Sequence, residues 1–73
     1  MNNKYVTAFS NNLKELLNSE GITPYELSKR TGVPQASLSR YLSCQREISL
    51  GNLCKIADYF NEEVDVLIGR KEF

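Results

Sequence analysis

A group of small and polar residues in the middle of the chain has the composition of a surface that contacts nucleic acid. In a helix predicted over 35–43, Leu38, Tyr41 and Leu42 are spaced i, i+3 and i+4 and therefore share the inner face. The remaining, outward positions are Gln35, Ala36, Ser37, Ser39, Arg40 and Ser43. Short side chains let a helix enter a DNA major groove, which is about 12 Å wide. The free amides at its start also attract phosphate.

Residue types that would support catalysis or metal binding are scarce. The sequence has no histidine, which excludes Ser-His and Cys-His nucleophile pairs. Cys44 and Cys54 stand ten residues apart with no other soft ligand, so they do not form a zinc site. Glu26 is expected to cap a helix. We therefore expect a protein that is not an enzyme and uses no metal or cofactor.

Length and composition point to one small globular domain. The chain has 73 residues, of which 41% are hydrophobic and 25% charged. A domain of this size buries only about 60% of the surface that its unfolded chain exposes. It has no room for a large enclosed substrate cavity. A single domain over 1–73 that acts as a binding or interaction module is the expectation.

Neither end of the sequence predicts a membrane or export segment. The longest apolar run is Val66-Leu67-Ile68, whereas a membrane helix needs about 20 residues. The first five residues lack the apolar core of a signal peptide. We expect a cytoplasmic protein without membrane contact, with its cysteines reduced.

Charge is unevenly distributed although the formal net charge is zero. Residues 29–55 contain five basic side chains and one acidic side chain, a net charge of +4. Residues 56–73 carry −3, and residues 1–28 carry −1. A neutral chain with this distribution can present one positive face to an anionic partner.

Helical periodicity dominates the sequence, and strand alternation is weak. The sharpest local signal is a capping box over 23–26, in which Thr23 and Glu26 can satisfy each other's free amides and Pro24 suits the first helical position. Ser49 can cap a later helix, and Glu63 or Asp65 a short last one. The predicted fold is all-α, with five short helices over about 6–20, 24–31, 35–43 and 50–60, and around 64–68.

The same periodicity predicts which residues face the core. On the first helix they are Val6, Phe9, Leu13, Leu16 and Leu17. On the fourth they are Leu50, Leu53, Cys54, Ala57 and Phe60. The second contributes Leu27, and the fifth contributes Val64, Leu67 and Ile68. The last four residues, 70–73, are expected to be loose.

The second and third predicted helices, with the turn between them, have the length and pattern of a helix-turn-helix over about 23–43. Gly32 permits the sharp change of direction, and Val33 and Leu38 can pack the two helices together. The stretch from Ile22 to Tyr41 resembles the helix-turn-helix of phage-repressor-type regulators, the Cro/CI or XRE family. The similarity continues through residues 49–60 and 64–69. It implies a lambda-repressor-like DNA-binding domain, usually a homodimer on a partly palindromic operator in double-stranded DNA.

The resemblance also implies which residues contact DNA. The base-reading positions fall on Gln35, Ala36 and Arg40, with Ser37 and Ser39 nearby. Gln35 can bond adenine, Arg40 can bond guanine or a phosphate, and Ala36 can touch a thymine methyl. The implied phosphate contacts are Thr23, Tyr25, Arg46, Ser49 and Asn52.

Several positions depart from the family pattern. Pro24 stands where many members have a phosphate-binding Gln, and Pro34 where many have a capping Ser or Thr. Cys44 stands where many have Gly, which predicts an altered turn. Leu17 and Leu42 occupy positions that hold an Arg–Glu pair in some members, so an apolar contact is expected instead.

Two functions follow from these observations. The first is a sequence-specific transcriptional regulator, a repressor that places its third helix in the major groove. The second is a protein-interaction module of the same fold, of antitoxin or anti-repressor type, which the neutral charge and Pro24 favour. For single residues, Arg40 could instead form a surface ion pair, and Tyr25 could be a plain surface ring. The candidates for a dimer contact are Tyr59, Val64, Val66 and Phe73.

Overall fold

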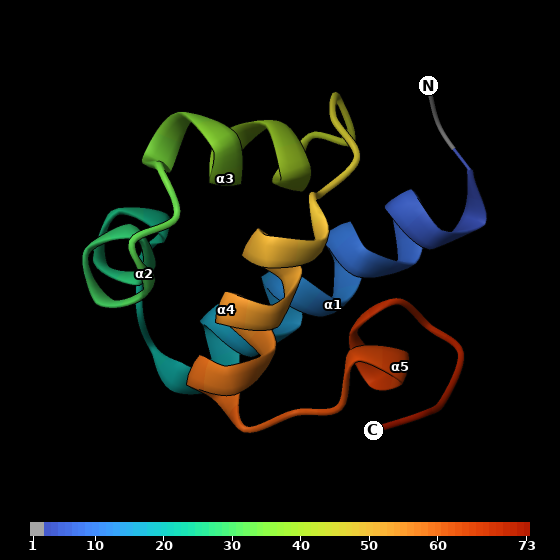
Figure 1. Ribbon diagram of the computed structural model, residues 1–73. Helices are drawn as coiled ribbons and strands as arrows, with labels where there is room; N and C mark the ends of the chain where they lie inside the picture. The colour runs from blue at the N-terminus through green and yellow to red at the C-terminus, as the bar shows by residue number, and fades with distance from the viewer. Residues whose placement is uncertain (1–2) are drawn as a thin grey trace.

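The computed structural model describes residues 3–73, and within that range it contains five helices and no strand (Figure 1). The helices are α1 (Lys4–Glu20), α2 (Pro24–Thr31), α3 (Gln35–Leu42), α4 (Leu50–Phe60) and α5 (Val64–Leu67). The predicted all-α fold is confirmed, and most helix ends agree within a residue. Helix α1 starts earlier than predicted because the Asn3 side chain caps it, accepting hydrogen bonds from the amides of Tyr5 and Val6 at 2.9 Å.

The predicted capping box at the start of α2 is confirmed. Thr23 Oγ1 accepts a hydrogen bond from the Glu26 amide at 3.2 Å, and Glu26 Oε1 accepts one from the Thr23 amide at 3.1 Å. Pro24 occupies the first turn, where a missing amide proton costs nothing. The start of α2 is therefore determined by four consecutive residues.

Helix α3 ends in a left-handed turn at Cys44, whose φ is 60°. The Cys44 amide donates to the Tyr41 carbonyl at 3.2 Å, and the Gln45 amide donates to the Arg40 carbonyl at 2.8 Å. This pair of bonds is the Schellman motif that often closes a helix on a glycine. The prediction of an altered turn is wrong, because Cys44 adopts the conformation that glycine would adopt.

Replacing Cys44 with glycine is expected to stabilise the protein by about 0.5–1 kcal/mol. A non-glycine residue in the left-handed region costs about 1–2 kcal/mol, and the greater entropy of unfolded glycine offsets part of the gain. Urea unfolding of both proteins measures the difference. Asn61→Gly is the control, because Asn61 has a similar φ of 53° but tolerates it better. A loss of stability in Cys44→Gly would show that the Cys44 side chain packs favourably.

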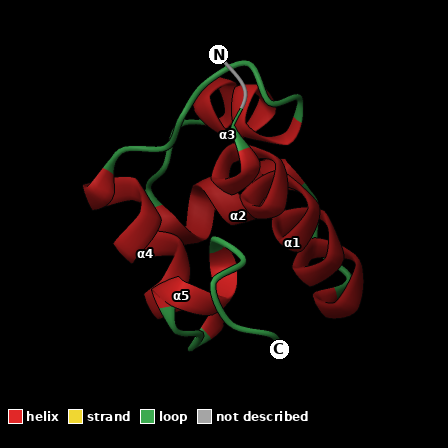
Figure 2. Ribbon diagram, turned by 90° about the vertical axis from the view of Figure 1, so that its right-hand side faces the viewer, coloured by secondary structure: helices red, strands yellow, loops and turns green. Residues whose placement is uncertain are grey.

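All five helices and the turn after α2 contribute to one core. Helix α1 packs against α3 and α5, and α2 packs against α3 and α4 (Figures 1 and 2). The fully buried apolar side chains are Leu13, Leu27, Val33, Leu38, Ile56 and Leu67. The predicted inner face of α1 is confirmed except that Leu16 is only half-buried. Leu17 lies in the core, and Leu42 packs against the core cluster. A direct apolar contact between these two side chains stays a prediction.

The inner face of α4 differs from the prediction. Ile56 is fully buried beside Leu53 and Ala57, whereas Leu50 is 81% exposed and Cys54 is exposed. Both sets of residues fit helical spacing, but the face of α4 that is buried is the one that carries Ile56. Helix α4 packs against α2 and α5. On α5, Val66 is buried, so its prediction as a dimer contact is wrong.

Two polar side chains on α1 bond to helix ends in the interior. Ser10 Oγ donates to the Leu42 carbonyl at 2.8 Å, which fastens the end of α3 to α1. Asn12 Nδ2 donates to the carbonyls of Val66 and Leu67 at 3.0 and 3.1 Å, which fastens α5 to α1. Carbonyls at helix ends often lack partners within their own helix. The bonds to the Leu42 and Leu67 carbonyls supply such a partner, whereas the Val66 carbonyl also accepts from the Gly69 amide at 3.2 Å.

The chain after α5 is held more firmly than predicted. The amides of Arg70 and Lys71 both donate to the Asp65 carbonyl, at 2.8 and 3.1 Å. Lys71 Nζ also pairs with Glu63 at 3.0 Å. The expectation of a loose tail is therefore wrong for these two residues. None of the helices between residues 3 and 73 is long and apolar enough to cross a membrane.

Candidate nucleic-acid interface

The turn between α2 and α3 is held by hydrogen bonds and by packing. The Gly32 amide donates to the Ser28 carbonyl at 2.9 Å, where φ of Gly32 is 81°. Thr31 Oγ1 donates to the Leu27 carbonyl at 2.7 Å and accepts from the Val33 amide at 3.2 Å. Val33 itself is fully buried. These contacts fix the angle at which α3 leaves α2, as the predicted helix-turn-helix requires.

The inner face of α3 is anchored by Leu38 and Tyr41. Leu38 is fully buried, and the Tyr41 ring packs edge-on against Phe9 with 6.0 Å between ring centres. The Tyr41 hydroxyl accepts a hydrogen bond from Asn52 Nδ2 at 3.0 Å. Tyr41 therefore links α1, α3 and α4, which confirms that it lies beneath α3 rather than on its surface.

The outer face of α3 is open. The figures show α3 at the edge of the molecule, with no other described helix over its outer side (Figures 1 and 2). Of the predicted base-reading residues, Gln35, Ala36, Ser39 and Arg40 are exposed and Ser37 is half-buried. The structure thus brings all five onto one helix, with the apolar anchors on the opposite face.

The start of α3 carries no side-chain cap, because Pro34 occupies the capping position. The Pro34 carbonyl accepts from the amides of Ser37 and Leu38 at 3.0 and 3.1 Å. Within the described part of the chain, the amides of Gln35 and Ala36 have no acceptor. Amides of this kind at a helix start can bind a phosphate oxygen.

The arginines near α3 differ in what they contact. Arg30 on α2 is engaged: its Nη1 donates to the Tyr59 hydroxyl at 2.6 Å, and it pairs with Glu26 at 3.9 Å. The bond to Tyr59 raises the pKa of Arg30. Among residues 3–73, Arg40 and Arg46 form no ion pair. The structure therefore does not support the alternative of a surface ion pair for Arg40.

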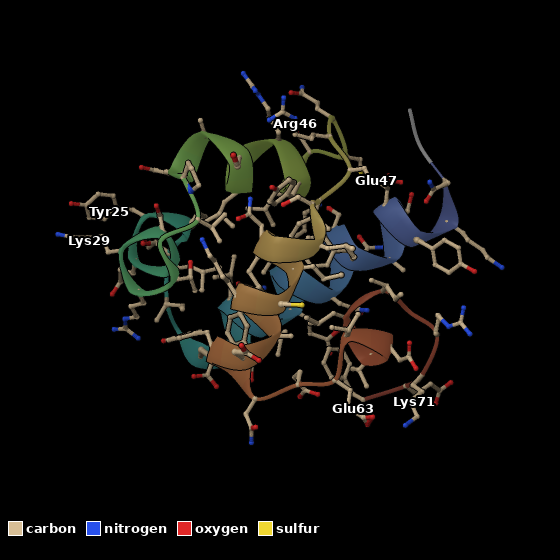
Figure 3. The ribbon with its side chains drawn as sticks, viewed as in Figure 1. Tyr25, Lys29, Arg46, Glu47, Glu63 and Lys71 are labelled. Carbon is tan, nitrogen blue, oxygen red and sulfur yellow. The ribbon has the colours of Figure 1, made fainter. Side chains whose placement is uncertain are left out.

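Two of the predicted phosphate contacts, Tyr25 and Arg46, have exposed side chains. Tyr25 is 54% exposed, and Lys29 Nζ lies 5.2 Å from the centre of its ring. Figure 3 shows both projecting from α2, and Arg46 projecting from the loop after α3, far from Glu63 and Lys71. From the sequence, Lys29 was predicted only as one of the basic side chains of residues 29–55. Its spacing of four residues from Tyr25 is the signal that pairs them.

The other predicted phosphate contacts also have structural roles. The hydroxyls of Thr23 and Ser49 accept from the amides of Glu26 and Asn52, each at 3.2 Å. The Asn52 side chain holds the Tyr41 hydroxyl. Each of these three side chains can still form further hydrogen bonds, but each already uses one polar atom in a bond within the protein.

The turn held by hydrogen bonds and by buried Val33, the anchored helix α3 and the open polar face of that helix define a helix-turn-helix domain. The sequence matches the family model for helix-turn-helix proteins (HTH_3) over residues 13–67. The chain therefore belongs to this family, the XRE-type DNA-binding domains that the sequence resembles.

A solved structure shares the fold. It is a transcriptional regulator from Listeria innocua, with a TM-score of 0.77 and 23% sequence identity. The alignment covers 89% of this chain and 61% of the Listeria chain, so this chain spans less than two thirds of that protein. A search of curated proteins gave no match.

Proposed function

We propose that this protein is a cytoplasmic, sequence-specific transcriptional regulator that binds double-stranded DNA as a homodimer and represses by occupying its operator. The outer face of α3 is the observation that carries this proposal. Its polar side chains are exposed, its arginine is free of ion pairs among residues 3–73, and its opposite face is locked into the core. A rigid helix with such a face suits insertion into a major groove. Family membership and the regulator fold of the Listeria protein support the same proposal.

In the proposed complex, side chains on α3 read base edges. The Gln35 amide can donate to and accept from adenine at N7 and N6, and the Arg40 guanidinium can donate to O6 and N7 of guanine. Ala36 can contact a thymine methyl, while Ser37 and Ser39 can bond to several bases.

Groups around α3 would hold the DNA backbone. Tyr25 and Lys29 on one side, and Arg46 on the other, can contact phosphates on either side of the groove. The free amides of Gln35 and Ala36 add a phosphate site at the start of α3. Thr23, Ser49 and Asn52 would contribute weaker phosphate contacts, because part of each polar side chain already bonds within the protein.

Selection from a random duplex library at about physiological ionic strength, where charge screening is realistic, tests the proposal. A recovered motif with two inverted half-sites is the expected result. A pool without any enriched sequence would contradict sequence-specific binding.

Salt dependence separates this proposal from the second candidate, a protein-interaction module. The net charge of zero and Pro24 in place of a phosphate-binding Gln favour that candidate. For a DNA-binding protein, the logarithm of affinity falls with the logarithm of salt concentration, with a slope of about −0.9 per neutralised phosphate. An interaction module is expected to bind no DNA even at low salt.

Arg40→Ala is expected to weaken operator binding by about 1–3 kcal/mol and to relax the preference at one base position. The reason is the loss of a two-bond contact with guanine. Affinity measured on the selected site and on single-base variants checks both effects. Arg70→Ala removes the same charge from the chain beyond α5, where Arg70 pairs with Asp65, and serves as the control. An equal loss on every sequence would assign Arg40 to a phosphate.

A further inference from the structure

One side-chain hydrogen bond joins α3 to α4 in the part of the chain that the structure describes. Asn52 Nδ2 donates to the Tyr41 hydroxyl at 3.0 Å. Helix α3 packs mainly against α1 and α2, whereas α4 packs mainly against α2 and α5. In Figure 1 the first turn of α4 lies beneath the last turn of α3. The bond therefore fastens the start of α4 to the end of α3.

Tyr41 offers Asn52 an acceptor in a fixed position. Only 3% of Tyr41 is exposed, and its ring stands edge-on against Phe9 on α1. Asn52 is half-buried on the first turn of α4, where its backbone amide donates to Ser49 Oγ at 3.2 Å. Both ends of the bond between Tyr41 and Asn52 are thus anchored, so the side-chain amide of Asn52 is held in one orientation.

The side-chain amide of Asn52 keeps one donor free. Its nitrogen carries two protons, and the bond to Tyr41 uses one of them. Because the amide group is planar and held, the second N–H also points in a fixed direction. Arg46 lies in the loop that leads to this turn and forms no ion pair among residues 3–73. A phosphate that approaches this turn would therefore meet a cation and an oriented neutral donor.

We infer that Tyr41 is a positioning residue for DNA binding, whose buried hydroxyl orients the Asn52 amide toward a backbone phosphate. This inference rests on the proposed function. A donor that is held before binding loses little side-chain entropy when the phosphate arrives, so it binds more tightly than a mobile donor. Phosphate contacts fix the register of a protein on the duplex. The bond between Tyr41 and Asn52 thereby ties this phosphate contact to the base-reading face of α3.

A double-mutant cycle on DNA affinity tests the inference, with the duplex recovered by selection as the probe. Asn52→Ala is expected to weaken binding on the order of tenfold and Tyr41→Phe about fivefold, because each loses an oriented hydrogen bond to a phosphate. The double variant is expected to bind as Asn52→Ala does, since the hydroxyl acts only through the Asn52 amide. Losses that multiply, to about 50-fold, would give Tyr41 a separate structural role and overturn the inference.

Tyr5→Phe is the matched control for the loss of a hydroxyl. Tyr5 on α1 is 40% exposed, and among the described residues its hydroxyl forms no hydrogen bond. This variant is expected to bind DNA as the wild type does. Urea unfolding of every variant verifies that the chains are folded under the conditions of the titration.

Asn52→Asp separates the phosphate contact from the bond to Tyr41. The Tyr41 hydroxyl can turn to donate to the new carboxylate, so the link between the helices is kept. The free N–H is replaced by an anion that repels phosphate, so DNA binding is expected to be at least as weak as in Asn52→Ala. A variant of this kind that bound DNA as tightly as the wild type would overturn the inference.

NMR relaxation of the Asn52 side-chain amide in the free wild-type chain needs no variant and decides the question even if Tyr41→Phe fails to fold. An order parameter of about 0.8, close to that of rigid backbone, is expected, whereas a value below about 0.6 would overturn the inference. A wild-type chain that selects no DNA would refute the proposed function and this inference together. A folded Tyr41→Phe chain that binds as tightly as the wild type would refute this inference alone.

Discussion

Leu38→Ala is expected to destabilise the protein by about 2–5 kcal/mol, the range for truncating a fully buried leucine. A chain of 73 residues has a total stability of about 4–11 kcal/mol, so the variant loses a large part of it. Leu38 is the deepest side chain of α3, and the cavity it leaves would loosen the helix that carries Gln35 and Arg40. DNA affinity is therefore expected to fall although no proposed contact residue is changed. Urea unfolding and DNA titration measure the two effects.

Leu50→Ala is the matched control for this prediction. The same chemical change is made on α4, but Leu50 is 81% exposed, so stability is expected to change by no more than about 0.5 kcal/mol. If both variants unfolded at the same urea concentration as the wild type, α3 would not be anchored by Leu38.

Gly69→Ala is expected to cost about 2–4 kcal/mol, from two causes that act together. Gly69 has a φ of 84°, a conformation that strains any residue with a Cβ atom. An added Cβ would also lie 2.7 Å from the Cβ of Ala8 on α1, far inside van der Waals contact. Because Ala8 has no flexible side chain to move aside, the end of α5 would have to shift away from α1. Thermal or urea unfolding gives the loss directly.

Gly21→Ala separates the two causes. Gly21 has a φ of 67°, but an added Cβ would meet no atom within 4 Å. Only backbone strain remains, and the lower entropy of unfolded alanine offsets part of it, so a loss of about 1 kcal/mol is expected. Equal losses in the two variants would show that the contact between Gly69 and Ala8 relaxes without cost.

The helix boundaries were predictable because their causes are local. The two members of the capping box, Thr23 and Glu26, are three residues apart. The left-handed residues Gly21, Gly32 and Asn61 directly follow the helices α1, α2 and α4 that they end. The inner face of α4 was not predictable in the same way. Residues starting from Leu50 or from Leu53 both fit a period of 3.6, and only packing against other helices selects Ile56 over Cys54.

Polar groups with distant partners also lay beyond sequence reasoning. The acceptor of Ser10 lies 32 residues away in the sequence, and the two acceptors of Asn12 lie 54 and 55 residues away. The acceptor of Asn52 lies 11 residues away. A polar residue within an apolar stripe signals a buried bond but does not name its acceptor. For this reason Asn52 was predicted only as a phosphate contact, and its bond to Tyr41 emerged from the fold.

The candidate site was predicted well in one respect. Leu38 and Tyr41 form the inner face of α3, and helix geometry then places Gln35 and Arg40 on the exposed outer side. A groove of about 260 Å³ beside Leu50 could not be predicted, because its walls come from the first turns of α1, the loop before α4, the start of α4 and the end of α5, which are separated in the sequence.

The two faces of α3 have consequences for how this protein can change over evolution. The buried face holds the helix, whereas the exposed side chains at Gln35, Ala36, Ser39 and Arg40 contribute little to the core. Substitutions at these positions are therefore nearly free of a folding penalty. If α3 reads DNA as proposed, gene duplication followed by a few such changes gives each descendant its own binding sequence while the scaffold stays the same.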